Sequence, residues 1–299
     1  MNDKPEISLI ICSRNRADSL EWALGSVRAD DMQEARAELV LVDNASTDNT
    51  GAIMRGFRDA AVFPVTVVDE PRPGLGLARN SGLAQARGDI LVFTDDDCRL
   101  QAGFIPQVAP VFRDGRFQYC GGRILLHDPD DAMVAVDYRK TFRLIKPHSF
   151  IPAGEIQGAN MIIKREVFDA IGPFDPELGA GREFRCEEAE FIARASMHGF
   201  SGAHVPELVV YHHHRRKSSD LPEYRTANNF ARGAYYAIML RRGQLRYLFG
   251  GLLRSLVPRP SSIRQFGYFN RLRHELRGAW CYLRSRRRAA LVPGRRRPA

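Results

Sequence analysis

The chain has 299 residues, of which 44% are hydrophobic and 26% charged, so it can fold as one large α/β domain or as two smaller ones. Its five cysteines are odd in number and form no CxxC pair, which argues against a disulfide framework and against a zinc site. The net charge of +9 is concentrated at one end, because residues 231–299 contain seventeen arginines and a single acid and carry +16, which leaves −7 on residues 1–230.

Strands and helices are predicted to alternate over the first 93 residues. Apolar runs of strand length are separated by segments that have the spacing of amphipathic helices or that end at a glycine. Asp18 and Glu21 are expected to form a capping box on the first helix, and Ser46 or Thr47 is expected to cap the second. The alternation favours a parallel, doubly wound sheet, in which the C-terminal ends of the strands form the ligand crevice. The predicted strands are residues 7–12, 39–42, 62–68 and 90–93.

The alternation weakens beyond residue 101. Strands are expected at residues 118–126, 158–164 and 205–211, and a helix is expected at residues 187–198. After Pro222 the pattern is helical, with arginines placed among apolar residues, and residues 293–299 are expected to be disordered. The first residues do not have the pattern of a signal peptide, and no apolar run approaches the ~20 residues of a membrane-spanning helix. We therefore expect a protein of the reducing cytoplasm that does not cross a bilayer.

Three adjacent acids, Asp95, Asp96 and Asp97, follow the strand predicted at residues 90–93. Carboxylates packed side by side repel one another and lose solvation energy, so their presence favours a bound cation. Mg²⁺ and Mn²⁺ prefer such hard oxygen ligands. The alternative is a solvated turn that caps the following helix. The pattern thus predicts a divalent-metal site at the end of this strand.

The loop at residues 71–76 is rich in proline and glycine and contains Gly74 and Gly76. A dinucleotide-binding loop would carry a third glycine and would follow the first strand of the sheet, whereas this loop follows the third. We therefore interpret it as a loop that lets the backbone approach a ligand, or as a tight turn.

Five segments, taken together, resemble the family 2 glycosyltransferases of GT-A fold. They occur in the family's order and at its spacing, and the resemblance covers residues 7–215. It implies a Rossmann-like α/β fold with a mixed, mainly parallel sheet, a nucleotide-sugar donor, a divalent cation and inversion at the anomeric carbon. The segments are SLIICSRNR, ELVLVDNASTD, GLGLARNSGLAQARGDILVFTDDD, GANMIIKREVFDAIGPFDPELGAG and CEEAEF.

The resemblance assigns roles to the three acids and to the residue that ends the second strand. Asp97 matches the metal ligand of the family's DxD motif, and Asp95 matches the acid that meets the ribose or metal-bound water. Asp96 fills the variable position and is able to substitute for either. Asp43 stands where the family often begins a pair of acids, the second of which reads the base of uridine-type donors. Here the second position is Asn44, which weakens the case for a uridine nucleotide, and a helix-capping turn is the alternative role of Asp43.

Three further residues are expected at the donor. Ser13 and Arg14 lie where family members line the nucleotide pocket, and Arg79 is expected to face the phosphates. A place on the protein surface is the alternative for both arginines.

A histidine is also expected near the metal. His212 ends the last predicted strand, where many family members carry a histidine, with His213 and His214 as less favoured alternatives. Because imidazole binds Mn²⁺ well and Mg²⁺ poorly, participation of His212 would favour Mn²⁺ as the cofactor. A basic exposed turn is the alternative interpretation of this segment.

An inverting transfer needs a base that accepts the proton of the acceptor hydroxyl. Glu188 matches the second acid of the family's Glu-Asp pair, which is the base, although glutamate is one methylene longer than the family's aspartate. Glu187 and Glu190 are alternatives, and acids in a first helical turn also simply complement the helix dipole. Asn160 and residues 154–158 are expected to edge the acceptor cleft.

The C-terminal segment has the composition of a helix in a membrane interface, because its arginines are spaced through apolar and aromatic residues with almost no acids. We predict peripheral contact with the anionic inner face of the cell membrane, with nucleic-acid binding or a plain helical lid as alternatives. The predicted division is a glycosyltransferase domain at residues 1–220 and a basic helical extension at residues 221–299.

The sequence therefore predicts a metal-dependent inverting glycosyltransferase that uses Mn²⁺ or Mg²⁺ and acts on a glycan or a lipid-linked acceptor. A nucleotidyltransferase is the enzymatic alternative, but its phosphate loop would be rich in glycine, and residues 13–16 contain none. A membrane or nucleic-acid adaptor with a decayed transferase domain is the non-enzymatic alternative. The joint presence of Asp95, Asp97 and Glu188 counts against it.

Overall fold

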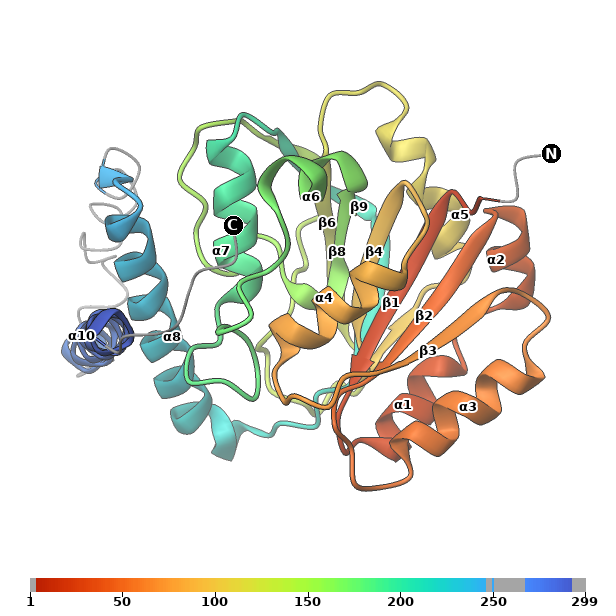
Figure 1. The fold of residues 1–299 in the computed structure, drawn as a ribbon, viewed down its shortest axis with the longest axis horizontal. Coiled ribbons are helices and arrows are strands. Elements are labelled where there is room, and N and C mark those ends of the chain that lie inside the picture. The colour runs from red at the N-terminus through yellow and green to blue at the C-terminus, as the bar shows by residue number, and fades with distance from the viewer. Residues whose placement is uncertain (1–3, 246–248, 250–266, 292–299) are drawn as a thin grey trace.

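The computed structural model of the protein describes residues 4–245, 249 and 267–291. Within this part of the chain, nine strands form one sheet with helices on both faces (Figure 1). The strand order is β3-β2-β1-β4-β8-β6-β9-β5, and β7 pairs with β9. The predicted disordered end at residues 293–299 lies outside the described residues.

The N-terminal half of the sheet is parallel. β1 lies between β2 and β4, and β3 pairs with the outer side of β2. The register pairs Ser13 with Asp43 and Cys12 with Asp95. The polar residues that end β1, β2 and β4 therefore lie side by side at the C-terminal ends of these parallel strands. The alternation of strands and helices predicted this arrangement. These strands are β1 (Ile7–Ser13), β2 (Ala37–Asp43), β3 (Val65–Asp69) and β4 (Ile90–Asp95).

The other half of the sheet is mixed. β8 runs antiparallel to both β4 and β6, β6 and β9 are parallel, and β5 and β7 run antiparallel to β9. The expected mixed sheet is confirmed, although parallel pairs do not outnumber antiparallel pairs among the described strands. The strands are β5 (Cys98–Leu100), β6 (Tyr119–Leu126), β7 (Arg143–Ile145), β8 (Met161–Lys164) and β9 (Gly202–His212).

Two hydrophobic cores lie on opposite faces of the sheet. Successive residues of a strand point to opposite faces, so Ile10 joins one core while Leu9 and Ile11 join the other. The core of Ile10 is covered by α4, α6 and α7, and the second core is covered by α1, α2, α3 and α5. The helices are α1 (Ala17–Leu24), α2 (Ala29–Glu34), α3 (Thr50–Ala60), α4 (Leu75–Gln85), α5 (Phe104–Val108), α6 (Arg165–Ile171) and α7 (Glu187–Met197), with 3₁₀ turns at Pro110–Phe112, Gly158–Asn160 and Ser218–Asp220.

The C-terminal segment forms two long helices, α8 (Leu221–Arg241) and α10 (Gly267–Leu291), which confirms the helical pattern expected after Pro222. Tyr235 of α8 and Tyr282 of α10 are buried in the core of α4, α6 and α7, so these helices complete that core. Neither of them, nor any other described helix, has the length and apolar character needed to span a membrane.

The crossing of α8 and α10 depends on glycine. A Cβ atom at Gly233 would lie 1.8 Å from the carbonyl oxygen of Glu275, and one at Gly278 would lie 1.9 Å from that of Phe230. No side chain fits in either place, because both obstructing atoms belong to the backbone. The absence of side chains therefore lets the two helix backbones touch.

A backbone N–H in the first turn of α1 is hydrogen-bonded by a side chain from another part of the chain. No side chain caps α1 locally, so the capping box expected from Asp18 and Glu21 is wrong. Instead, Asp48 Oδ2 accepts a hydrogen bond from the backbone N–H of Ala17 at 3.3 Å. Sequence spacing did not reveal this contact because the acceptor lies in the loop after β2.

The start of α3 also differs from the prediction. Asp48 Oδ1 accepts the N–H of Thr50 at 3.0 Å, a role that was expected of Ser46 or Thr47. The Ser46 hydroxyl instead accepts the N–H of Asn15 at 3.0 Å. The loops after β1 and β2 are thus hydrogen-bonded to each other at the edge where the strands end.

Candidate active site

The C-terminal ends of β1 and β4 open into a cavity of about 510 Å³. Its walls come from the turns after these two strands, the start of α7, the end of β9 and the start of α8. Connections leave β1 and its neighbours in opposite directions here, which is where ligands bind in open α/β sheets. The cavity brings together seven residues predicted from the sequence: Ser13, Arg14, Asp95, Asp96, Asp97, Glu188 and His212.

Asp97 is the most strongly held of the three acids. Arg16 Nη2 lies 2.7 Å from Asp97 Oδ2, and His212 Nε2 lies 3.1 Å from Asp97 Oδ1. Burial alone would raise the pKa of Asp97, but the hydrogen bond and charge of His212, together with Arg16, lower it to about 2. Asp97 is therefore an anion at neutral pH, ready to bind a cation.

His212 is oriented by a backbone contact. Its Nδ1 lies 3.1 Å from the carbonyl oxygen of Ala135, to which Nδ1–H donates, so Nε2 points toward Asp97. Burial favours the neutral imidazole, yet the hydrogen bond and charge of Asp97 raise the pKa of His212. A backbone acceptor on one nitrogen is the usual support of a histidine that ligates a metal through the other.

Asp96 ties two loops together. Ser13 Oγ donates to Asp96 Oδ2 at 2.5 Å, and Arg16 Nε lies 3.1 Å from Asp96 Oδ1. Burial raises the pKa of Asp96 to about 7, and the guanidinium of Arg16 opposes this effect. These contacts join the turn after β1 to the turn after β4, which gives Asp96 a structural task that its place in the sequence did not reveal.

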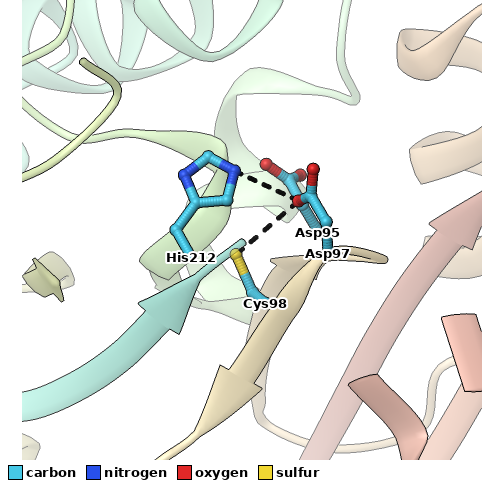
Figure 2. A group of neighbouring side chains, drawn as sticks. All are labelled: Asp95, Asp97, Cys98 and His212. Carbon is cyan, nitrogen blue, oxygen red and sulfur yellow. Dashed lines mark hydrogen bonds and ion pairs between the residues drawn. The ribbon is translucent and has the colours of Figure 1, made fainter. Parts of the chain in front are cut away.

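Four side chains could hold a metal ion together. Ligand atoms of Asp95, Asp97, Cys98 and His212 all lie within 4.8 Å of one another (Figure 2). Two carboxylates and an imidazole suit Mn²⁺, whereas a thiol suits softer metals. Burial raises the pKa of the Cys98 thiol well above its usual value, and sulfur is a softer ligand than Mn²⁺ and Mg²⁺ prefer. The residues present therefore fit a Mn²⁺ or Mg²⁺ site built on Asp95, Asp97 and His212.

Only one of the three candidate bases faces the cavity. Glu187 is 4% exposed and pairs with Arg79 at 2.9 Å, and Glu190 is fully buried and pairs with Arg194 at 3.0 Å. Glu188 lines the cavity instead. Burial, followed by the charge of Glu187, raises the pKa of Glu188 to about 8.

Arg79 lies behind the cavity wall. Its side chain is buried, with Nη1 2.9 Å from Glu187 Oε1 and Nη2 3.6 Å from Asp95 Oδ1. This arrangement favours a positioning role between α7 and β4 over the expected contact with phosphates, which stays a prediction. It also contradicts the surface position that was the alternative for this arginine.

Asn44, and not Asp43, reaches the cavity wall. The Asn44 amide is fully used, since Nδ2 donates to the carbonyls of Glu70 and Arg72 and Oδ1 accepts the N–H of Gly74 at 2.8 Å. Asp43 Oδ1 accepts the N–H of Ser46 at 3.0 Å. Asp43 thus forms the turn that was its alternative role, and a contact between Asp43 and the donor stays a prediction.

The glycines of the loop at residues 71–76 serve contacts within the protein. A Cβ at Gly76 would lie 2.7 Å from the carbonyl oxygens of Asp175 and Leu178. Gly74 has φ +144, a conformation that L-residues rarely adopt. The loop therefore lets the segment before α7 approach the start of α4.

Several residues of the wall were not predicted. Some of them, such as Arg16 and Cys12, lie in segments that had been singled out, but no role in the site had been assigned to them. Tyr224 and Asn228 belong to α8, where helical spacing gave no sign of a ligand site. The remaining unpredicted residues are Leu75, Ala78, Ala135, Ala180, Gly181, Arg185 and Arg216.

Asn160 does not edge this cavity, which corrects the expectation. It is 1% exposed, and Nδ2 donates to the carbonyls of Arg123 and Leu208 at 3.0 and 2.9 Å. Asn160 thus bridges β6 and β9 where their register shifts. Residues 154–158 are not part of the cavity wall either.

A doubly wound α/β sheet with a carboxylate cluster at the crevice beyond its parallel strands is typical of α/β enzymes that bind their ligands at this crevice. Residues 8–172 match the family described as Glycosyl transferase family 2, and the chain belongs to that family. The protein is therefore a glycosyltransferase, as the resemblance implied.

Named relatives agree with this assignment. Glycosyltransferase AglE of Haloferax volcanii is 25% identical over 260 residues, which cover 86% of this chain and 83% of AglE. The succinoglycan biosynthesis protein ExoM of Rhizobium meliloti is 31% identical over 217 residues, which cover 70% of this chain and 67% of ExoM.

Solved structures confirm the GT-A fold. Mannosyltransferase PcManGT from Pyrobaculum calidifontis, in complex with GDP-Man and Mn²⁺, has a TM-score of 0.64 at 19% identity, over 97% of this chain and 77% of that one. TarS 1–349 of S. aureus, in complex with UDP-GlcNAc, has a TM-score of 0.55 at 17% identity, over 92% and 81% of the two chains.

Proposed function

We propose that the protein is an inverting glycosyltransferase that moves a sugar from a nucleoside diphosphate donor to an acceptor hydroxyl. The observation that carries the proposal is the place of Glu188, which lines the same cavity as Asp95, Asp97 and His212. The neighbouring acids are held in ion pairs, so Glu188 is the carboxylate of α7 that can reach a substrate.

The donor is proposed to bind between the turns after β1 and β4. Asp95, Asp97 and His212 would hold the metal, which would neutralise the charge that develops on the leaving diphosphate. The imidazole favours Mn²⁺ over Mg²⁺. Ser13 and Arg14 are proposed to contact the nucleotide, and Arg14 is exposed at the cavity wall. Two neighbours in fold were solved with nucleotide sugars, which supports a donor of this class.

Glu188 is proposed as the general base. Its carboxylate accepts the proton of the acceptor hydroxyl while the hydroxyl oxygen attacks the anomeric carbon and the nucleoside diphosphate departs from the other face of the sugar. Arg79 acts through other residues, because it fixes Glu187 beside Glu188 and reaches Asp95. Asp96 keeps the two donor loops in register through Ser13 and Arg16.

The start of α8 is proposed to belong to the same functional unit. Tyr224 and Asn228 line the cavity although they follow the boundary expected after residue 220. They extend the wall beyond the donor residues and are proposed to contact the acceptor. We propose a glycan or a lipid-linked sugar as that acceptor, and a location at the inner face of the cell membrane, reached through the basic segment.

The proposal is tested by donor binding and by the product. Melting temperatures are measured with UDP-GlcNAc, GDP-mannose and dTDP-glucose, each with and without Mn²⁺. One donor should raise the melting temperature more strongly with Mn²⁺ than without it. If no nucleotide sugar stabilises the protein under either condition, the donor site is wrong. Once an acceptor is found, proton NMR of the product should show the anomeric configuration opposite to that of the donor.

A further inference from the structure

The outward side of α10 presents an apolar stripe to solvent. Phe269, Leu276 and Trp280 are 76%, 62% and 64% exposed. Because a helix turns by about 100° per residue, these positions lie within about 40° of one another on the helix surface. Arg273 and Arg277 are exposed beside them. α10 thus carries an exposed apolar stripe with arginines along its edge.

The acidic residue of α10 lies on the opposite, buried side of the helix. Glu275 is the one acid in its sequence and is 8% exposed. Its carboxylate pairs with Arg232 Nε of α8 at 2.7 Å and with Arg271 Nε at 3.7 Å. The outward face of α10 therefore carries positive charge and no negative charge.

We propose that this outward face of α10 is a docking surface for an anionic lipid bilayer. Exposed aromatic and aliphatic side chains on one helix face are suited to the boundary between headgroups and acyl chains, and arginines are suited to lipid phosphates. The absence of acids on that face selects a negatively charged surface as its partner. This inference rests on the membrane location proposed above and names the surface that makes the contact, but it does not rest on glycosyl transfer, because bilayer binding needs neither donor nor base.

The docking surface lies close to the active-site cavity. A groove of about 370 Å³ beside α8 is lined by His274 and Arg277 of α10 and by Arg185, which also lines the cavity. Arg277 is thus shared by the docking surface and the groove, and Arg185 by the groove and the cavity. Docking of α10 brings the cavity to the bilayer, where an acceptor anchored in lipid is presented.

Tryptophan fluorescence tests the insertion directly. The chain has two tryptophans, and Trp22 lies on α1, where Arg99 stacks over its ring at 5.3 Å. In a Trp22→Phe protein, emission reports on Trp280 alone. Vesicles of phosphatidylcholine with 30% phosphatidylglycerol should shift this emission to the blue and protect it from acrylamide, whereas pure phosphatidylcholine should do neither. An unchanged spectrum with the anionic vesicles overturns the proposal.

Double variants distinguish vesicle binding through this face of α10 from nonspecific adsorption of exposed apolar side chains. Leu276→Ser/Trp280→Ser and Arg273→Glu/Arg277→Glu should each lower affinity for anionic vesicles in co-sedimentation at least tenfold. Val62→Ser/Leu144→Ser removes similar exposed apolar side chains elsewhere and should leave binding unchanged. Circular dichroism shows that each variant keeps its helices. Parent-like binding by both α10 variants overturns the proposal.

Two alternative explanations, membrane binding through residues 292–299 and dimerisation through the α10 face, are tested with related variants. A variant that ends at residue 291 lacks three further arginines and should still bind. If that deletion abolishes binding while the α10 variants bind normally, the tail and not α10 holds the membrane, and the proposal is wrong. If size-exclusion chromatography without lipid shows a dimer that Leu276→Ser/Trp280→Ser dissociates, the face binds a second copy, which also contradicts the proposal.

Discussion

Replacement of Glu188 by glutamine tests the assignment of the base. The amide has nearly the shape of the carboxyl group, but it cannot accept a proton at neutral pH. General-base catalysis typically contributes about 10²–10⁴-fold, so turnover should fall by about that factor while donor binding changes by less than about twofold. Glu183→Gln is the matched control, since Glu183 is exposed and lies outside the cavity wall.

The structure also gives the direction of the pH dependence. Burial and the charge of Glu187 raise the pKa of Glu188 to about 8. A base acts only when ionised, so about one tenth of the molecules are competent at pH 7 and about nine tenths at pH 9. kcat/KM should therefore rise about tenfold over this interval and level off above it.

The assay is release of nucleoside diphosphate between pH 6 and 9.5, with donor affinity measured by calorimetry. Turnover by Glu188→Gln above about a tenth of the parent rate would refute the assignment of the base. A flat profile of kcat/KM between pH 7 and 9 would refute the argument from burial. Loss of donor binding in Glu188→Gln would show that the side chain organises the site and does not simply accept a proton.

Four further substitutions probe the metal site and the fold. Asp97→Asn should remove the Mn²⁺-dependent part of the donor's thermal stabilisation, whereas Cys98→Ser should retain it because Mn²⁺ prefers oxygen and nitrogen ligands to sulfur. Arg79→Met should lower the free energy of unfolding in urea by about 3–5 kcal/mol, because it leaves Glu187 buried without its partner. Gly278→Val should lower the melting temperature measured by circular dichroism, because a Cβ there meets backbone at 1.9 Å.

Each of these outcomes has a contrary result. Equal Mn²⁺ effects in Asp97→Asn and the parent would exclude Asp97 as a ligand. A loss below about 1 kcal/mol in Arg79→Met would contradict the argument that the buried Glu187 depends on this ion pair. Gly267 has no atom within 4 Å of a Cβ, so Gly267→Val is the control for the crossing, and an equal effect there would contradict the packing argument.

The parallel half of the sheet and the acids at its edge could be predicted from the sequence. A continuous apolar run such as residues 90–93 is typical of a strand buried on both faces, and the polar residue after it falls at the strand's C-terminal end. Parallel strands bring such ends together, so Ser13 and the three acids were expected in one place. Their roles came from the resemblance, which also supplied Glu188 and His212.

The rest of the site depends on contacts that no local pattern encodes. Arg16 contacts the acids at the cavity, whereas Arg79 lies in a buried ion pair. The periodicity of apolar residues in the sequence does not distinguish these two positions. Tyr224 and Asn228 reach the cavity because α8 packs against α7, whose start lines the same cavity, and this packing is a tertiary outcome. The cap of α1 by Asp48 was not predicted for the same reason, since it joins two separate loops.

The glycine crossing of α8 and α10 fixes the distance between the active-site cavity and α10. Tyr224 in the cavity wall and Gly233 at the crossing belong to one uninterrupted helix, which separates them by about 14 Å at 1.5 Å per residue. Because a helix is rigid, unlike a flexible linker, this separation does not vary. If α10 rests on a surface, the start of α8 and the cavity wall that it forms stay at a fixed distance from that surface.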